Sequence, residues 1–257
     1  MKITSDIMRL FQCCSYSLAC VAHYRDKVNN EKKRKLFSMV MLPAGLIKYA
    51  WKSVCTHFSK YHKDKLLVVT IIKNEDEYLS EYCAYYRNIG ADILLYDNDS
   101  DISALRFAGG GIKVKPIHGI KRQIDAYNDA INVYGKNYKY MLFLDIDEFL
   151  VSKSLQDRSA TIVEAMDYYF ERLKPNAAGI GINWLMFGSN GHERHPDGGV
   201  IENYTRCAED EFERNKMVKV CVKPERVIGF VDPHLPWPLI GYEIENADGE
   251  CLRSPNR

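Results

Sequence analysis

Short apolar runs alternate with segments of helical periodicity from residue 66 onwards. The first run, 66–72, is continuous and rich in β-branched residues, as is typical of a strand covered on both faces. The pattern then predicts, in order, a helix at 78–90, strands at 93–96 and 112–114, a helix at 124–134 ended by Gly135, and a strand at 140–144.

Beyond residue 150 the pattern is less regular. It predicts a helix at 162–173, strands at 179–182, 218–222 and 226–230, a loop at 184–199, and little periodicity after 233. Alternating strands and helices favour an α/β fold with parallel crossovers. We therefore expect one domain, 65–257, with a mixed, mostly parallel sheet flanked by helices.

Residues 1–64 have a different character and are expected to form a helical N-terminal extension. A charged stretch at 27–35 precedes an apolar segment broken by Pro43 and Gly45, and residues 52–65 are basic and aromatic. One interpretation is peripheral contact with an anionic membrane surface through residues 32–65. The commoner alternative is a helix packed on the main domain with a solvated basic face.

Composition excludes several classes of protein. Hydrophobic residues make up 46% of the chain, enough for a real core, and the net charge of +1 provides no overall field that would attract nucleic acid. Eight cysteines without a Cys-x-x-Cys pair argue against a disulfide scaffold. The chain contains no run of about 20 apolar residues, so the sequence predicts no membrane-spanning helix. A cytoplasmic protein, or one peripheral to the inner face of the membrane, is expected.

Three polar clusters each follow a predicted strand: 73–75, 97–100 and 145–148. Ligands of open α/β sheets bind beyond the carboxyl ends of the strands. We therefore expect all three clusters to line one crevice.

The cluster at 145–148 carries the most specific chemistry. Asp145-Ile146-Asp147 follows an apolar run, where carboxylates are costly unless a cation or hydrogen bonds compensate them. Such a pair suits Mg²⁺ or Mn²⁺, which take further ligands from substrate phosphates. A phosphohydrolase with an aspartate nucleophile is an alternative, but such enzymes usually carry Thr or Val where Phe149 stands, and carry the motif on the first strand.

An ordered series of motifs runs over residues 66–240. Its members are Lys73-Asn74-Glu75, Tyr78-Leu79, Glu81, Gly90, Tyr96-Asp97-Asn98, Ser100, Gln123, Asp145-Ile146-Asp147-Glu148-Phe149, Trp184, Phe187-Gly188, Lys219 before Pro224, and His234. The series resembles GT-A glycosyltransferases of the family 92 type and their bacterial family 2-type relatives in glycan and lipopolysaccharide synthesis. In that family Trp is usual at the position of Tyr82, and His is common at that of Tyr86.

The resemblance implies an inverting transfer from a nucleotide-sugar donor, expected to be a UDP-sugar, to a glycan or glycolipid acceptor. Metal ligands would be Asp145, Asp147 and His234, holding Mn²⁺ or Mg²⁺ against the diphosphate, with His234 as a ligand or diphosphate contact. The donor-binding residues would be Lys73, Asn74, Glu75, Asp97, Asn98, Ser100, Gln123 and Asp145.

Structural roles compete with several of these assignments. Asn98 and Ser100 are equally suited to closing a turn, Gln123 to a surface position, and His234 to packing. Trp184 fits either the core or a platform for an acceptor sugar, since the Gly-rich segment 188–191 follows it.

An inverting transfer needs a carboxylate base to accept the proton of the acceptor hydroxyl. Glu193, Glu209, Asp210 and Glu211 are available, and spacing does not choose among them. The family commonly continues into an Asn-His-Tyr segment and a terminal helix that are absent before Arg257. A non-catalytic glycan- or nucleotide-binding module of the same fold is therefore the main alternative to an enzyme.

Overall fold

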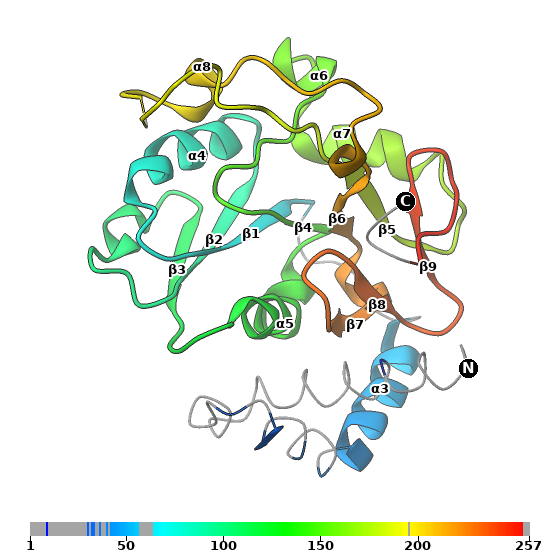
Figure 1. Cartoon of the computed structure of the whole chain (residues 1–257). Coiled ribbons are helices and arrows are strands. Elements are labelled where there is room, and N and C mark those ends of the chain that lie inside the picture. The colour runs from blue at the N-terminus through cyan, green and yellow to red at the C-terminus, as the bar shows by residue number, and fades with distance from the viewer. Residues whose placement is uncertain are drawn as a thin grey trace.

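A computed structural model describes residues 42–56, 64–194 and 196–253, together with the isolated positions 9, 30, 32, 33, 36 and 40. Its framework is a seven-stranded sheet with strand order β3-β2-β1-β4-β6-β5-β9 (Figure 1). These strands are β1 (Leu66–Ile72), β2 (Asp92–Asp97), β3 (Ile112–Pro116), β4 (Tyr140–Phe143), β5 (Ala177–Asn183), β6 (Val218–Val222) and β9 (Glu243–Asn246). A separate two-stranded sheet contains β7 (Val227–Phe230) and β8 (Pro236–Pro238).

The helices connect the strands and cover the sheet. They are α3 (Leu42–Thr56), α4 (Asp76–Asn88), α5 (Gln123–Tyr134), α6 (Lys153–Gln156), α7 (Ile162–Phe170) and α8 (Val200–Asn203). Single 3₁₀ turns are η2 (Ala104–Phe107), η3 (Gly135–Asn137), η4 (Glu213–Lys216) and η5 (Pro224–Arg226).

Strand pairing confirms a mixed, mostly parallel sheet. β1 is parallel to β2 and β4, β2 to β3, and β5 to β9, whereas β6 runs antiparallel to both β4 and β5. Because β1, β2 and β4 are mutually parallel, their carboxyl ends open on the same edge of the sheet. The polar clusters predicted after these strands are therefore brought to one edge.

The unbroken apolar run of β1 is explained by its two buried faces. Leu66 and Val68 belong to a core cluster with α4 and α7, whereas Leu67 and Val69 belong to a second cluster with α5 and β7. Successive side chains of a strand point to opposite faces, so both faces need apolar residues. Figure 1 shows the resulting layers, with α4 and α7 on one side of the sheet and α5, β7 and β8 on the other.

Helix α4 ends where Gly90 adopts a left-handed conformation, with φ of +91°. The N–H of Ala91 donates to the carbonyl of Tyr86 at 2.9 Å, which closes the last turn. The chain can then enter β2 directly, because glycine adopts this conformation without steric cost.

Three details differ from the sequence prediction. Gly135 keeps a right-handed conformation, with φ of −52°, and the chain continues into η3 instead of stopping at a left-handed cap. Helix α7 ends at Phe170, before the predicted limit of 173. The C-terminal segment contains β9, which extends the sheet beside β5 although Glu243 and Glu245 make it look unlike a buried strand. Glu245 is buried there with Lys174 at 3.2 Å.

Helix α3 lies in the predicted N-terminal extension, whose other residues fall largely outside the described part of the chain. Tyr49 packs with Ile228 and Leu239, and its hydroxyl accepts a hydrogen bond from the N–H of Ile240 at 2.9 Å. Lys48 donates to Asn132 at 2.7 Å. A mixed face of α3, with Tyr49 and Lys48, therefore faces the domain. None of the helices in the described residues has the length and apolarity needed to cross a membrane.

Candidate active site

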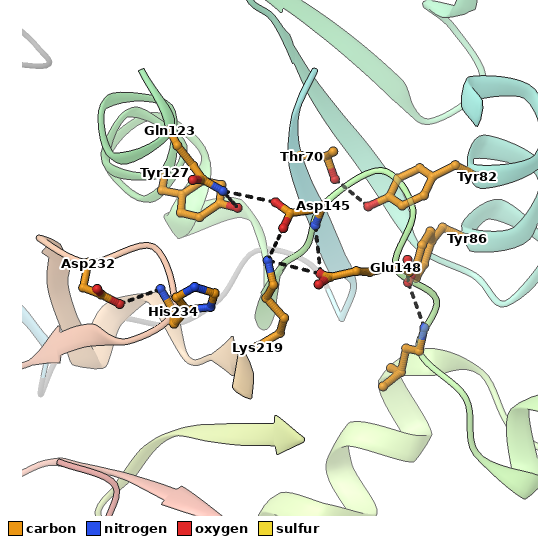
Figure 2. Close-up of polar contacts among 11 residues, drawn as sticks. Thr70, Tyr82, Tyr86, Gln123, Tyr127, Asp145, Glu148, Lys219, Asp232 and His234 are labelled. Carbon is orange, nitrogen blue, oxygen red and sulfur yellow. Dashed lines mark hydrogen bonds and ion pairs between the residues drawn. The ribbon is translucent and has the colours of Figure 1, made fainter. Parts of the chain in front are cut away.

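Asp145 lies directly beyond β4 and joins three elements. Its Oδ2 accepts a hydrogen bond from Nζ of Lys219 in β6 at 2.6 Å, and its Oδ1 accepts one from Nε2 of Gln123 in α5 at 3.1 Å (Figure 2). Gln123 is therefore half-buried and bonded to Asp145, so a purely solvated surface position does not describe it. The interactions fix the first carboxylate of the predicted Asp-x-Asp pair.

Lys219 also reaches Glu148, whose Oε2 lies 3.2 Å from the ammonium. The same oxygen accepts the N–H of Asp145 at 2.9 Å, so Glu148 closes the turn that carries both aspartates. Burial raises the pKa of Glu148 to about 7, although the ammonium of Lys219 acts in the opposite direction. Lys219 is almost fully buried, with 4% of its side chain exposed. One buried cation is therefore shared by two carboxylates.

Asp147 is exposed at the same edge. Burial raises the pKa of Glu75, and the negative charges of Asp147 and Asp145 raise it further, against the effect of a hydrogen bond from the Lys73 N–H. Glu75 therefore lies within electrostatic range of both aspartates. The segments after β1 and β4 contribute carboxylates to one region, as predicted.

Trp184 and His234 adjoin Lys219. Their rings meet edge to face with centroids 5.6 Å apart, and Nζ of Lys219 lies 5.7 Å from the centroid of the Trp184 ring. Within the described residues, Nε1 of Trp184 and Nδ1 of His234 are buried without a hydrogen-bond partner. An unpaired buried polar atom costs about 1–3 kcal/mol. Both atoms are therefore available to a ligand, on side chains that adjoin Lys219.

A hollow of about 270 Å³ adjoins this cluster at the ends of β1 and β2. Four predicted donor-binding residues line it: Lys73, Glu75, Asn98 and Gln123. Lys121 and Arg122 contribute to its wall from the start of α5. A larger hollow of about 490 Å³ near α6 and α7 contains none of the predicted site residues. The smaller hollow is therefore the better candidate for the binding site.

The loops around the smaller hollow contain three non-glycine residues in the left-handed conformation. Asn74, Asp99 and Lys121 have φ of 57°, 58° and 57°. Such residues are uncommon, and Lys121 lacks the short polar side chain that favours this conformation. The N–H of Asn74 donates to Oγ of Ser100 at 3.1 Å, which ties two of these loops together. Local backbone strain of this kind is typical of functional sites.

Several predicted donor-binding residues have structural partners. Asp97 accepts the N–H groups of Ser100 at 3.1 Å and Ala104 at 3.0 Å, one on each carboxylate oxygen. Asn98 donates to the carbonyl of Gly119 at 2.8 Å while lining the hollow. The turn-closing alternative, expected for Asn98 and Ser100, therefore describes Ser100, and Asp97 closes the same turn as its acceptor. Asn98 both holds the loop and lines the hollow.

The four candidate bases, Glu193, Glu209, Asp210 and Glu211, are all exposed on the long segment between β5 and β6. In the described structure, none has a side-chain contact with the carboxylate cluster. In the described residues, no three His, Cys, Asp or Glu side chains are close enough to hold a metal ion by themselves. The predicted set of Asp145, Asp147 and His234 is therefore not a preformed three-residue cage.

The structure adds supporting residues that sequence patterns did not assign. The hydroxyl of Tyr86 donates to the carbonyl of Glu148 at 2.9 Å and accepts the N–H of Leu150 at 2.9 Å. Glu81 accepts the N–H groups of Val200 at 2.5 Å and Ile201 at 3.2 Å. Glu81 belongs to the motif series and the position of Tyr86 is noted beside it, but neither the series nor helical spacing indicates these long-range contacts. A lysine inside the apolar run of β6 was the available signal for Lys219.

Comparison with known proteins identifies the family of the chain. No curated protein matches the chain. A solved structure, 4-diphosphocytidyl-2C-methyl-D-erythritol synthase from Anaerococcus prevotii DSM 20548, is similar at 9% identity over 75% of this chain and 94% of that chain, with a TM-score of 0.36. The model of glycosyltransferase family 92 matches residues 68–238, which contain the carboxylate cluster and the hollow. The chain therefore belongs to glycosyltransferase family 92.

Proposed function

We propose that this glycosyltransferase moves a sugar from a nucleoside-diphosphate donor, a UDP-sugar, to a glycan or glycolipid acceptor with inversion at the anomeric carbon. The observation that carries the proposal is the meeting of Asp145, Glu148, Lys219 and Gln123 beside a hollow at the carboxyl edge of the sheet. The family resemblance makes bacterial polysaccharide or lipopolysaccharide synthesis the expected setting.

The donor would bind in the hollow lined by Lys73, Glu75 and Lys121. Lysine side chains and the N–H groups at the start of a helix favour negatively charged phosphates, and α5 begins at Gln123 beside the hollow. The diphosphate would then lie between this basic wall and Asp145. Asn98 would contact the nucleoside side, while Asp97, Asn74 and Ser100 would shape the loops that hold it.

The carboxylates fit a divalent ion that arrives with the donor. Mg²⁺ and Mn²⁺ are commonly held by one or two carboxylates, with waters and substrate phosphates as the other ligands, so a preformed cage of three side chains is not required. Asp145 and Asp147 would supply the carboxylates, and the unpaired Nδ1 of His234 would provide a ligand or a diphosphate contact. The ion would neutralise charge on the departing diphosphate.

The acceptor would stack on Trp184, whose ring borders the cluster. In the transfer, the acceptor hydroxyl oxygen bonds to the anomeric carbon while the bond to the diphosphate oxygen breaks, and a base receives the hydroxyl proton. Glu193, Glu209, Asp210 and Glu211 are the candidate bases, and closure of their segment over the site would be needed. Alanine variants of each, measured with donor binding as a control, would identify the base.

Calorimetric titration of UDP with Mn²⁺, with Mg²⁺ and with chelator would test metal-dependent donor binding. Asp147→Asn is expected to abolish the metal-dependent part, whereas the exposed Asp157→Asn serves as the matched control. A screen of nucleotide sugars for metal-dependent hydrolysis would then identify the donor. Unchanged binding and turnover in Asp147→Asn would contradict the site assignment.

Two further outcomes would replace the proposal. UDP binding without turnover of any donor would support a non-catalytic nucleotide-binding module. A covalent aspartyl-phosphate would support a phosphohydrolase.

A further inference from the structure

Helix α3 exposes its apolar side to solvent. Ile47 is 72% exposed, Trp51 70% and Val54 59%, and all three recur at a spacing of three or four residues, which places them on one face. Leu36 and Val40 precede α3 in the chain and are 63% and 68% exposed. We call these five residues the apolar strip.

The orientation of α3 is fixed by contacts on its other side. Tyr49 is buried against Ile228 and Leu239, and Lys48 is bonded to Asn132. Burial lowers the pKa of Lys52 to about 7, with the charge of Lys48 adding to the effect. A surface helix normally turns its apolar face to the core and its charged face to water. Here a mixed face with Tyr49 and Lys48 is docked and the apolar strip is outside, so rotating the helix to hide the strip would break these contacts.

Basic and acidic residues are unevenly distributed along the chain. Residues 1–65 contain 13 Lys and Arg against 4 Asp and Glu, whereas residues 66–257 contain 22 against 30. Lys32 and Lys33, just before the apolar strip, are exposed. The net charge of +1 for the whole chain therefore hides a strongly basic N-terminal segment attached to an acidic domain.

We infer that the apolar strip of α3 lies in the surface of an anionic lipid bilayer, with the helix parallel to the membrane plane. Exposed apolar residues that include Trp, together with neighbouring lysines, suit the boundary between headgroups and acyl chains. Lysine and arginine near the surface add attraction to anionic lipids. A second copy of the chain is the competing occupant, but an apolar strip preceded by the exposed Lys32 and Lys33 in a basic segment is better matched to a negatively charged surface.

The inference goes beyond the proposed reaction, because it concerns where the enzyme works, and it accounts for a glycolipid as the acceptor class. The sequence alone allows two interpretations of residues 32–65: contact with a membrane surface, or a packed helix with a solvated basic face. The outward position of the apolar strip now favours it over a merely solvated basic face.

Vesicle co-sedimentation tests the inference. The full chain is used, so that any N-terminal residues that pack on the apolar strip are present in the assay. We expect binding to phosphatidylcholine vesicles that contain phosphatidylglycerol, much weaker binding to phosphatidylcholine alone, and weakening at high salt. The double variant Ile47→Ser/Trp51→Ser should lose binding by about tenfold or more, since two exposed apolar anchors are removed. Tyr168→Ser, an exposed aromatic on α7, is the matched control and should bind normally.

Failure to bind either vesicle, or unchanged binding by the double variant, would overturn the inference. A dimer of the wild-type chain that the double variant converts to monomer, without vesicle binding, would identify a second copy as the occupant and overturn it too. Asp147→Asn should bind vesicles normally, so loss of the proposed reaction and loss of membrane binding are distinguishable.

Discussion

Nζ of Lys219 lies 2.6 Å from Oδ2 of Asp145. Lys219 is in β6, and Asp145 follows β4, the strand that pairs antiparallel with β6. The ammonium also reaches Glu148 at 3.2 Å. A single buried cation therefore holds together the carboxylates that the proposed donor site needs. A metal ion bound to Asp145 would compete with the ammonium of Lys219 for the carboxylate oxygens. Lys219 is therefore the most informative residue to replace.

Lys219→Met should destabilise the protein and abolish donor binding. Removing one partner of a buried ion pair leaves uncompensated charge, which costs roughly 3–5 kcal/mol when burial is complete. Because 43% of the Asp145 side chain is exposed, we expect roughly 2 kcal/mol in the free energy of unfolding. Urea unfolding and UDP titration measure the two effects. Lys223→Met, at the end of the same strand, is the control and should keep UDP binding.

Tyr86→Phe should loosen the segment that carries Glu148. The variant removes a hydroxyl that bonds both the carbonyl of Glu148 and the N–H of Leu150. Leaving such groups unpaired costs about 1–3 kcal/mol. Urea unfolding should show this loss, and UDP affinity should fall at the same time. Tyr85→Phe, which loses only one bond to the carbonyl of Leu150, should have the smaller effect; equal effects would contradict the assignment.

Features of the site that depend on local sequence patterns could be predicted, whereas contacts between segments distant in the sequence could not. The runs that became β1, β2, β4 and β6 were predictable because buried strands leave a local apolar signature, and the strand ends located the carboxylates. Interactions between distant segments left no such signature. Tyr86 looked like a packing residue on α4, and its bonds to the segment after Asp147 depend on how α4 crosses the sheet.

The same limit applied to the chain ends. β9 was missed because Glu243 and Glu245 break the apolar pattern, and only the pairing of Glu245 with Lys174 makes its burial tolerable. On α3 the sequence contained both apolar and basic residues, but which side faced the domain was decided by Tyr49 and its contacts with Ile228 and Leu239.

Glu225 should make stability depend on pH. Burial raises its pKa to about 7, so between pH 4.5 and 7 the folded state keeps a proton that the unfolded state releases. Stability contributed by this group is therefore present below pH 4.5 and lost as pH rises to 7, by up to about 3 kcal/mol. Glu225→Gln should reduce the difference between urea unfolding at pH 5 and pH 7, and the part contributed by Glu148 should remain. The exposed Glu171→Gln is the control, and an unchanged slope in Glu225→Gln would contradict the prediction.

Glu81→Ala should affect the acceptor more than the donor. Glu81 of α4 accepts the N–H groups of Val200 and Ile201, and its carboxylate lies where a Cβ on Gly199 would be. This contact holds the segment between β5 and β6, which begins with Trp184 and contains the candidate bases. Freeing it should raise the acceptor KM about tenfold, the cost of roughly one charge-assisted hydrogen bond, while UDP affinity stays within twofold of wild type. Steady-state kinetics with varied acceptor and calorimetry with UDP measure the two quantities. Glu77→Ala, one turn earlier on α4, controls for helix effects; an equal loss of UDP affinity in Glu81→Ala would mean that the segment supports the donor site instead.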